Sequence, residues 1–74
     1  MSKSLGQKLL GVNFNPSSLS TVDEAKQKSA DLIDIVHANM IDSTSEEAQL
    51  IHNEALRRII DAQMWAEKAI TWKD

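Results

Sequence analysis

Cysteine is absent from the 74-residue sequence. Its absence excludes a disulfide framework and a thiolate metal site, and it fits a reducing compartment such as the cytoplasm. Long apolar runs are also missing, so the sequence predicts no membrane-spanning helix. Aromatic residues are rare, with two tryptophans, one phenylalanine and no tyrosine. No glycine or proline follows Pro16, so nothing interrupts a helical pattern in the rest of the chain.

Hydrophobic residues make up 42% of the chain and charged residues 26%, a composition typical of a globular domain. A single domain spanning residues 1–74 can barely bury enough apolar surface to be stable alone. Because no disulfide reinforces it, oligomerisation is the remaining route to stability. The net charge of −3 argues against binding to a DNA or RNA duplex and to an acidic membrane. A small anionic ligand remains compatible if basic residues gather locally.

Three segments carry helical signals, which predicts an all-α fold. A short helix is expected over residues 4–10, and two long helices over 21–41 and 45–72. The short connection between the long helices predicts an antiparallel hairpin. Gly11 stands where a C-cap glycine belongs. Three pairs have capping-box spacing: Ser4 with Gln7, Thr21 with Glu24, and Ser43 with Glu46.

The last predicted helix has two apolar seams. The first is expected to pack on the preceding helix and consists of Ala48, Ile51, Ala55, Ile59, Ala62, Ala66 and Ala69. The second consists of Leu56, Ile60 and Met64, and it has no partner within the chain. Trp65 and Trp72 are seven residues apart and share a face that points away from much of the first seam. We therefore predict a subunit interface that includes Trp65, Trp72, Met64 and Ile60.

Residues for catalysis or metal binding are not evident. His37 and His52 are the only imidazoles, they lie on different predicted helices, and neither has the companions of a helical metal site. Both are expected at a surface or an interface. The serines at 17, 18 and 20 lack a nearby base and indicate a loop and a helix cap. The sequence therefore predicts no enzyme activity, no metal and no cofactor.

Basic residues form two candidate sets for an anionic ligand. Lys26 and Lys28 lie in the first turns of the 21–41 helix, where the helix dipole adds positive potential. Phe14, in the preceding linker, can stack on a nucleobase. Alternatively, Phe14 fills the core and the lysines are solvated. The second set is Arg57, Arg58 and Lys68, which a symmetric oligomer would gather into a ring that needs an anion.

Two stretches, "FNPSSLSTVDEAK" (14–26) and "AQMWAEKAITW" (62–72), resemble a family of small phage proteins that inhibit the bacterial CBASS and Thoeris immune systems. Members act as sponges: they hold a signal nucleotide without cleaving it. They do so in the cytoplasm of the infected host. The resemblance covers residues 14–72 and implies a homo-oligomer, typically a hexamer. It also implies that cyclic dinucleotides bind between neighbouring subunits.

The family's roles fall on particular residues of this chain. The resemblance implies that Phe14, before the loop formed by Pro16 and Ser17, stacks on a base, and that Lys26 meets a phosphate. Some members bind cyclic trinucleotides in separate pockets near a three-fold axis. The candidates for such a pocket here are Arg57, Arg58 and Lys28.

Two alternatives stay open at this point. One is a sponge for cyclic ADP-ribose signals of Thoeris immunity; family members directed at them often carry extra sequence, which favours the anti-CBASS branch here. The other is a helical protein-interaction module with no nucleotide ligand. Such a module would be a monomer or dimer with Trp65 exposed.

Overall fold

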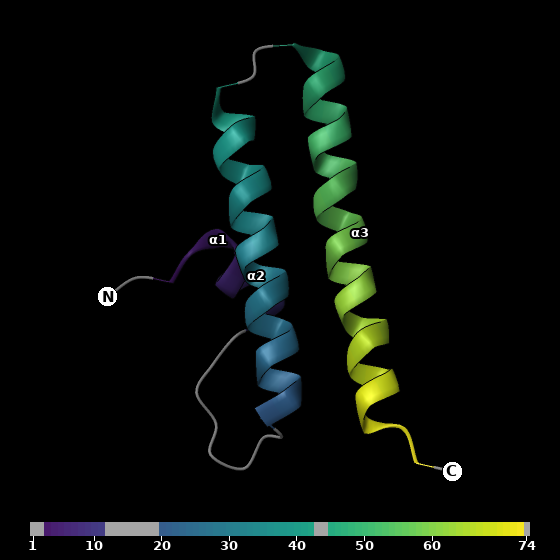
Figure 1. The fold of residues 1–74 in the computed structure, drawn as a ribbon. Coiled ribbons are helices and arrows are strands. Elements are labelled where there is room, and N and C mark those ends of the chain that lie inside the picture. Colours follow the sequence, from purple (N-terminus) through teal and green to yellow (C-terminus); the bar gives the residue numbers. More distant parts are fainter. Residues whose placement is uncertain (1–2, 12–19, 43–44, 74) are drawn as a thin grey trace.

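The computed structural model describes residues 3–11, 20–42 and 45–73. Within these ranges the chain forms three helices and no strand: α1 (Leu5–Leu10), α2 (Ser20–Ile41) and α3 (Glu46–Thr71). The predicted all-α class is confirmed, and each helix end lies within one residue of its predicted position. Figure 1 shows α2 and α3 side by side and running in opposite directions, with α1 lying against α2.

The first helix begins and ends at the residues that its sequence signals predict. The Ser4 hydroxyl accepts a hydrogen bond from the Gln7 N–H (3.2 Å), and the Gln7 side chain accepts one from the Ser4 N–H (3.0 Å), which completes a capping box. Gly11 ends the helix with a φ of 66°, a left-handed conformation that glycine adopts without steric cost. Six residues cannot hold a helix alone, so α1 depends on packing against α2.

The contact between α1 and α2 is close because Gly6 has no side chain. A Cβ at this position would overlap the backbone of Ala30, the residue that Gly6 faces on α2. The Gly6 N–H donates to Asp34 Oδ1 at 2.7 Å, which satisfies an amide that the first turn of a helix leaves unpaired. The side-chain amide of Gln7 donates a longer hydrogen bond to Gln27 Oε1 at 3.4 Å. Gly6 is therefore the point at which α1 is fixed to α2.

The two long helices have N-terminal details that differ from the sequence prediction. α2 begins at Ser20, so Thr21 lies inside the first turn instead of capping it. α3 is capped by Ser45, whose hydroxyl accepts from the Ala48 N–H at 3.0 Å, and the predicted cap Ser43 lies outside the described residues. The cap at Ser45 leaves two glutamates in the first turn, where negative charge is favourable at the positive end of the helix dipole.

The described core is small and draws on all three helices. Leu10, Ala30 and Ile33 are buried together, and Ile33 is the one large side chain among the described residues that is fully buried. Four partly buried side chains pack against this cluster: Leu5, Leu56, Ile59 and Ile60. Because Ala30 and Ile33 both belong to α2, this helix forms the centre of the core.

The seam of α3 that faces α2 is not the predicted one. Ile51 is 69% exposed, and Ala62, Ala66 and Ala69 are exposed as well. The buried or half-buried positions are instead Ala48, His52, Ala55, Leu56, Ile59, Ile60, Gln63 and Glu67. The large side chains of the cluster decide the rotation of the helix, because they bury more apolar area than alanines do. The face that they define continues through Gln63 and Glu67, and the later alanines of the predicted seam, from Ala62 on, are exposed.

The molecule is flat, with principal extents of 45 × 33 × 12 Å. The long helices α2 and α3 form a layer that the short α1 covers only in part (Figure 1). Stable domains are usually built from two or more packed layers, so this layer leaves apolar side chains exposed. The exposed large ones are Leu9, Leu32, Ile35, Leu50, Ile51, Met64, Trp65, Ile70 and Trp72.

Candidate functional site

The predicted ligand-binding residues belong to the segment before α2, to α2 and to α3. Phe14, Pro16 and Ser17 lie outside the described residues. The described residues of the predicted set are two lysines near the start of α2 and two arginines in the middle of α3. These pairs lie on different helices and do not form one cluster in a single chain.

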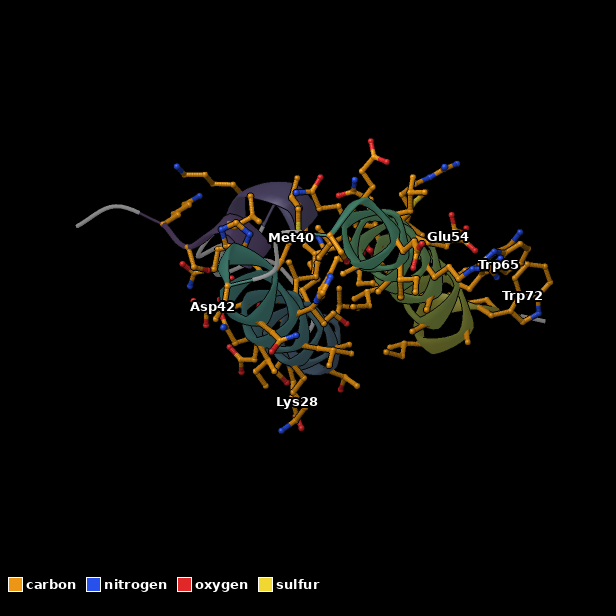
Figure 2. All side chains as sticks on the ribbon, turned by 90° about the horizontal axis from the view of Figure 1, so that it is seen from above. Lys28, Met40, Asp42, Glu54, Trp65 and Trp72 are labelled. Atoms are coloured by element: carbon orange, nitrogen blue, oxygen red, sulfur yellow. The ribbon has the colours of Figure 1, made fainter. Side chains whose placement is uncertain are left out.

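Lys26 and Lys28 point to different sides of α2. Residues two positions apart on a helix are separated by about 200° of rotation. The ammonium groups of Lys26 and Lys28 therefore cannot bind the same small anion on one subunit. Lys26 lies one turn from the buried Val22 and one turn from the buried Ala30, and it is half-buried. Lys28 is exposed and points away from α1 and α3 (Figure 2). Lys26 alone of the pair lies beside the core of this chain.

Arg57 and Arg58 share one carboxylate. Arg58 Nε donates to Glu54 Oε2 at 2.9 Å, and an Arg57 guanidinium nitrogen lies 3.9 Å from Glu54 Oε1. Pairs of this kind on an exposed helix contribute about 0.3–0.5 kcal/mol, so they position the side chains more than they stabilise the fold. The cluster carries one more positive charge than negative, and both guanidinium groups remain accessible to an anion or a second subunit.

An aromatic and cationic cluster occupies the C-terminal part of α3. The Lys68 ammonium lies 5.1 Å from the centre of the Trp65 ring and 5.9 Å from that of the Trp72 ring. Both distances allow cation–π attraction, which contributes about 0.5–1 kcal/mol at an exposed site. Beside this cluster is a surface hollow of about 360 Å³, lined by Asp61, Met64, Trp65 and Lys68.

The predicted interface residues are divided between two surroundings. Met64, Trp65 and Trp72 are exposed to 60%, 61% and 64%. Figure 2 shows both indoles on the side of α3 that faces away from α2. Ile60, by contrast, is half-buried and packs against the core of its own chain. The exposed surface of this chain therefore includes three of the four predicted interface residues.

The two histidines hold structural positions that their spacing in the sequence does not reveal. His52 Nδ1 lies 2.6 Å from the Ala48 carbonyl oxygen, which can only accept, so this nitrogen carries the proton. His52 Nε2 then accepts from the Asn39 side-chain amide at 3.1 Å, which joins α3 to α2. His37 Nδ1 is buried, and no described residue gives it a hydrogen-bond partner.

Gln63 is the buried polar residue that the sequence prediction missed. Its side chain is 5% exposed, and its amide donates to Glu67 Oε2 at 3.1 Å, one turn along the helix. The four-residue spacing of Gln63 and Glu67, in line with Ile59 and Ile60, is the signal that could have placed both on the packing face. The hydrogen bond lowers the cost of burying the amide.

The described residues contain neither a metal site nor a membrane-spanning helix. Among the described residues, no group of three His, Cys, Asp or Glu side chains could hold a metal ion. None of the described helices has the length and apolar character that crossing a membrane requires. Comparison with known protein families, curated proteins and solved structures finds no match to this chain.

Proposed function

We propose that this chain forms a homo-oligomer, of hexameric size, that sequesters cyclic oligonucleotide second messengers of CBASS antiviral immunity without cleaving them. Cyclic dinucleotides are the expected main ligands, with cyclic trinucleotides as a second class in separate pockets. The site of action is the cytoplasm of an infected bacterium, where a phage protein of this kind keeps the signal from its immune effector.

The observation that carries the proposal is the set of large apolar side chains that the layer of α2 and α3 leaves exposed. Exposed side chains on α3 include Leu50, Met64 and Trp65, each at least 60% exposed. Large apolar side chains left exposed in this number indicate an interaction site. Assembly of several copies buries these side chains and creates pockets between subunits, which is where the proposed ligands would bind.

Charge supports an anionic ligand although the chain is acidic overall. Lys26 is half-buried at the start of α2, so a phosphate bound there would be partly shielded from water, and its attraction to the ammonium would be stronger than at a fully exposed site. Arg57 and Arg58 are accessible and have one excess positive charge between them. They are the proposed site for the second ligand class.

A sponge acts by mass action, so it must bind its signal tightly. An affinity of about 1 nM corresponds to about −12 kcal/mol. Stacking contributes about 1–3 kcal/mol per base, and charged hydrogen bonds to phosphates add to it. Two bases and two phosphates enclosed between subunits can therefore reach the required affinity.

Native mass spectrometry tests assembly and ligand class together. The purified protein is incubated with a panel of cyclic dinucleotides, cyclic trinucleotides and cyclic ADP-ribose isomers, and bound material is recovered after denaturation. A hexamer that releases an intact cyclic nucleotide is the expected result. Recovery of a cyclic ADP-ribose isomer instead would assign the protein to Thoeris signals, and a cleaved product would contradict sequestration.

Replacing Lys26 by alanine tests the phosphate contact. We expect Lys26→Ala to weaken binding of a cyclic dinucleotide by about tenfold to a hundredfold, because a charged hydrogen bond contributes about 1.5–3 kcal/mol. The matched control is Lys8→Ala, which removes an exposed lysine from α1. Isothermal titration calorimetry measures both affinities, and native mass spectrometry checks that the assembly is retained. Equal affinities in the two variants would remove Lys26 from the site.

A second candidate function is a protein-interaction module that binds no nucleotide. The side of α3 that faces away from α2 favours it, because Trp65, Trp72 and an arginine pair are the residue types that contribute most to protein interfaces. Under this alternative the purified protein takes up nothing from the nucleotide panel and stays a monomer or dimer. Its indole emission is then red-shifted, as expected for Trp65 in water.

A further inference from the structure

The side of α3 that faces away from α2 has a symmetric arrangement of residues. We call this the outer face of α3, and it consists of Leu50, Glu54, Arg57, Asp61, Trp65, Lys68 and Trp72, all of them exposed. The steps between successive members are four, three, four, four, three and four residues. This spacing keeps the side chains on one face of a straight helix. It also reads the same in both directions from Asp61.

The chemistry of the outer face is complementary about the same midpoint. Glu54 and Lys68 lie seven residues to either side of Asp61, and they have opposite charges. Arg57 and Trp65 lie four residues to either side, and a guanidinium on an indole face is a favourable cation–π pair. Leu50 and Trp72 lie eleven residues to either side, and both are apolar.

We infer that a second copy of the chain docks on the outer face of α3, with the two α3 helices antiparallel and a two-fold axis at Asp61. In this arrangement each pair described above is made twice, as an isologous interface requires. A parallel arrangement in register would instead place Glu54, Arg57 and Lys68 each opposite its own copy, and like charges repel. Antiparallel helix dipoles favour the same orientation.

Surface hollows on α3 fit this arrangement. The hollow of about 280 Å³ lined by Glu46, Gln49, Leu50 and Asn53 lies where Trp72 of the second copy arrives. The hollow beside Trp65 and Lys68 lies where Arg57 of the second copy arrives. The two indoles, which a single chain leaves more than 60% exposed, are then covered. The inference rests on the self-association within the proposed function. It does not depend on the dinucleotide site, but it places Arg57 in the subunit interface and leaves Arg58 as the arginine for the second ligand class.

The absence of cysteine makes the axis directly testable. Helices that pack at about 8–10 Å between axes bring residues on a two-fold axis within disulfide reach. We expect Asp61→Cys to give a disulfide-linked dimer as the main species after mild oxidation, seen by non-reducing electrophoresis. The matched control is Ala38→Cys, which is exposed on α2 and should stay mainly monomeric on the gel. Equal cross-linking in both variants would overturn the inference.

A charge exchange tests the register without a cross-link. We expect Glu54→Lys and Lys68→Glu each to weaken self-association by about tenfold in sedimentation equilibrium, because each dimer contains two such pairs. The double variant restores the opposite charges and should recover most of the lost affinity. A double variant at least as weak as the single ones would contradict the register.

A substitution at the midpoint, Asp61, is expected to strengthen self-association instead of weakening it. Two Asp61 carboxylates meet at the axis and repel each other, so Asp61→Asn should tighten self-association, whereas a free exposed position would show no change. A protein that stays monomeric at high concentration would overturn both this inference and the assembly in the proposed function, and would indicate a different protein on the outer face. A hexamer that binds nucleotide but gives no Asp61→Cys dimer would overturn this inference alone.

Discussion

The contact between α1 and α2 differs sharply from the outer face of α3. At the first, Gly6 lies against the backbone of Ala30 and its amide is bonded to Asp34, so an added methyl group does not fit. At the second, Trp65 and Trp72 are exposed by more than 60%, and their described contacts include the Lys68 ammonium. One region is packed to completion by the chain itself, while the other presents large apolar groups to water.

The difference indicates that stability and assembly depend on different residues. A short helix gains order only by packing, so α1 contributes to the fold through its contact with α2. The outer face of α3 contributes nothing to that core, yet it contains the residue types that give the largest gain when they are buried. Substitutions on the two sides should therefore affect different measurements.

The largest effect on the fold is expected at Ile33. Ile33→Ala removes the large side chain that is fully buried in the described core, and the cavity that it leaves should lower the free energy of unfolding by about 2–5 kcal/mol. Urea denaturation followed by far-ultraviolet circular dichroism at low protein concentration measures the loss. The control is Ile35→Ala, which removes the same group from an exposed position on α2. Equal losses in the two variants would contradict a core centred on Ile33.

A smaller effect is expected at Gly6. Gly6→Ala places a methyl group against the Ala30 backbone, which cannot move as a flexible side chain can, so α1 must shift from α2. We expect a loss of about 1–3 kcal/mol in the free energy of unfolding, although alanine has the higher helix propensity. Hydrogen exchange of the Gly6 amide region should also accelerate. A more stable variant would show that the close contact is not required.

Much of the fold could be predicted from local signals in the sequence. The capping box of Ser4 and Gln7 and the C-cap at Gly11 act within one helical turn, so the residues themselves determine them. The ends of α2 and α3 were also predicted within one residue, although Thr21 lies inside the first turn of α2 and Ser45 caps α3. The predicted exposed faces were also partly right: Trp65 and Trp72 point away from α2, as their seven-residue spacing indicated.

The rotation of α3 could not be predicted with the same rules, because it depends on contacts between distant residues. A seam of alanines and isoleucines has helical spacing as good as the observed one, and only packing against Ile33 and Leu10 selects Leu56 and Ile59 instead. The role of Gly6 was missed although a glycine inside a helix costs about 1 kcal/mol relative to alanine, which is itself a signal of close packing. The loop residues predicted to bind the ligand lie outside the described residues.

The smallest effect on the fold, and the most informative one, is expected at Trp65. Trp65→Ala should change the free energy of unfolding of the dilute chain by less than about 0.5 kcal/mol, because an exposed side chain has little packing to lose. At high protein concentration the natural chain gains stability from self-association, since an interaction that binds only the folded state stabilises it by mass action. Trp65→Ala should lose this gain, so its unfolding midpoint in urea should no longer rise with protein concentration.

Ile35→Ala is the control, because Ile35 is similarly exposed but lies on α2. It should keep the rise if the outer face of α3 forms the interface. A loss of the rise in both variants would place the interface on α2 as well, and a large loss in the dilute Trp65→Ala chain would mean that the two regions are not independent.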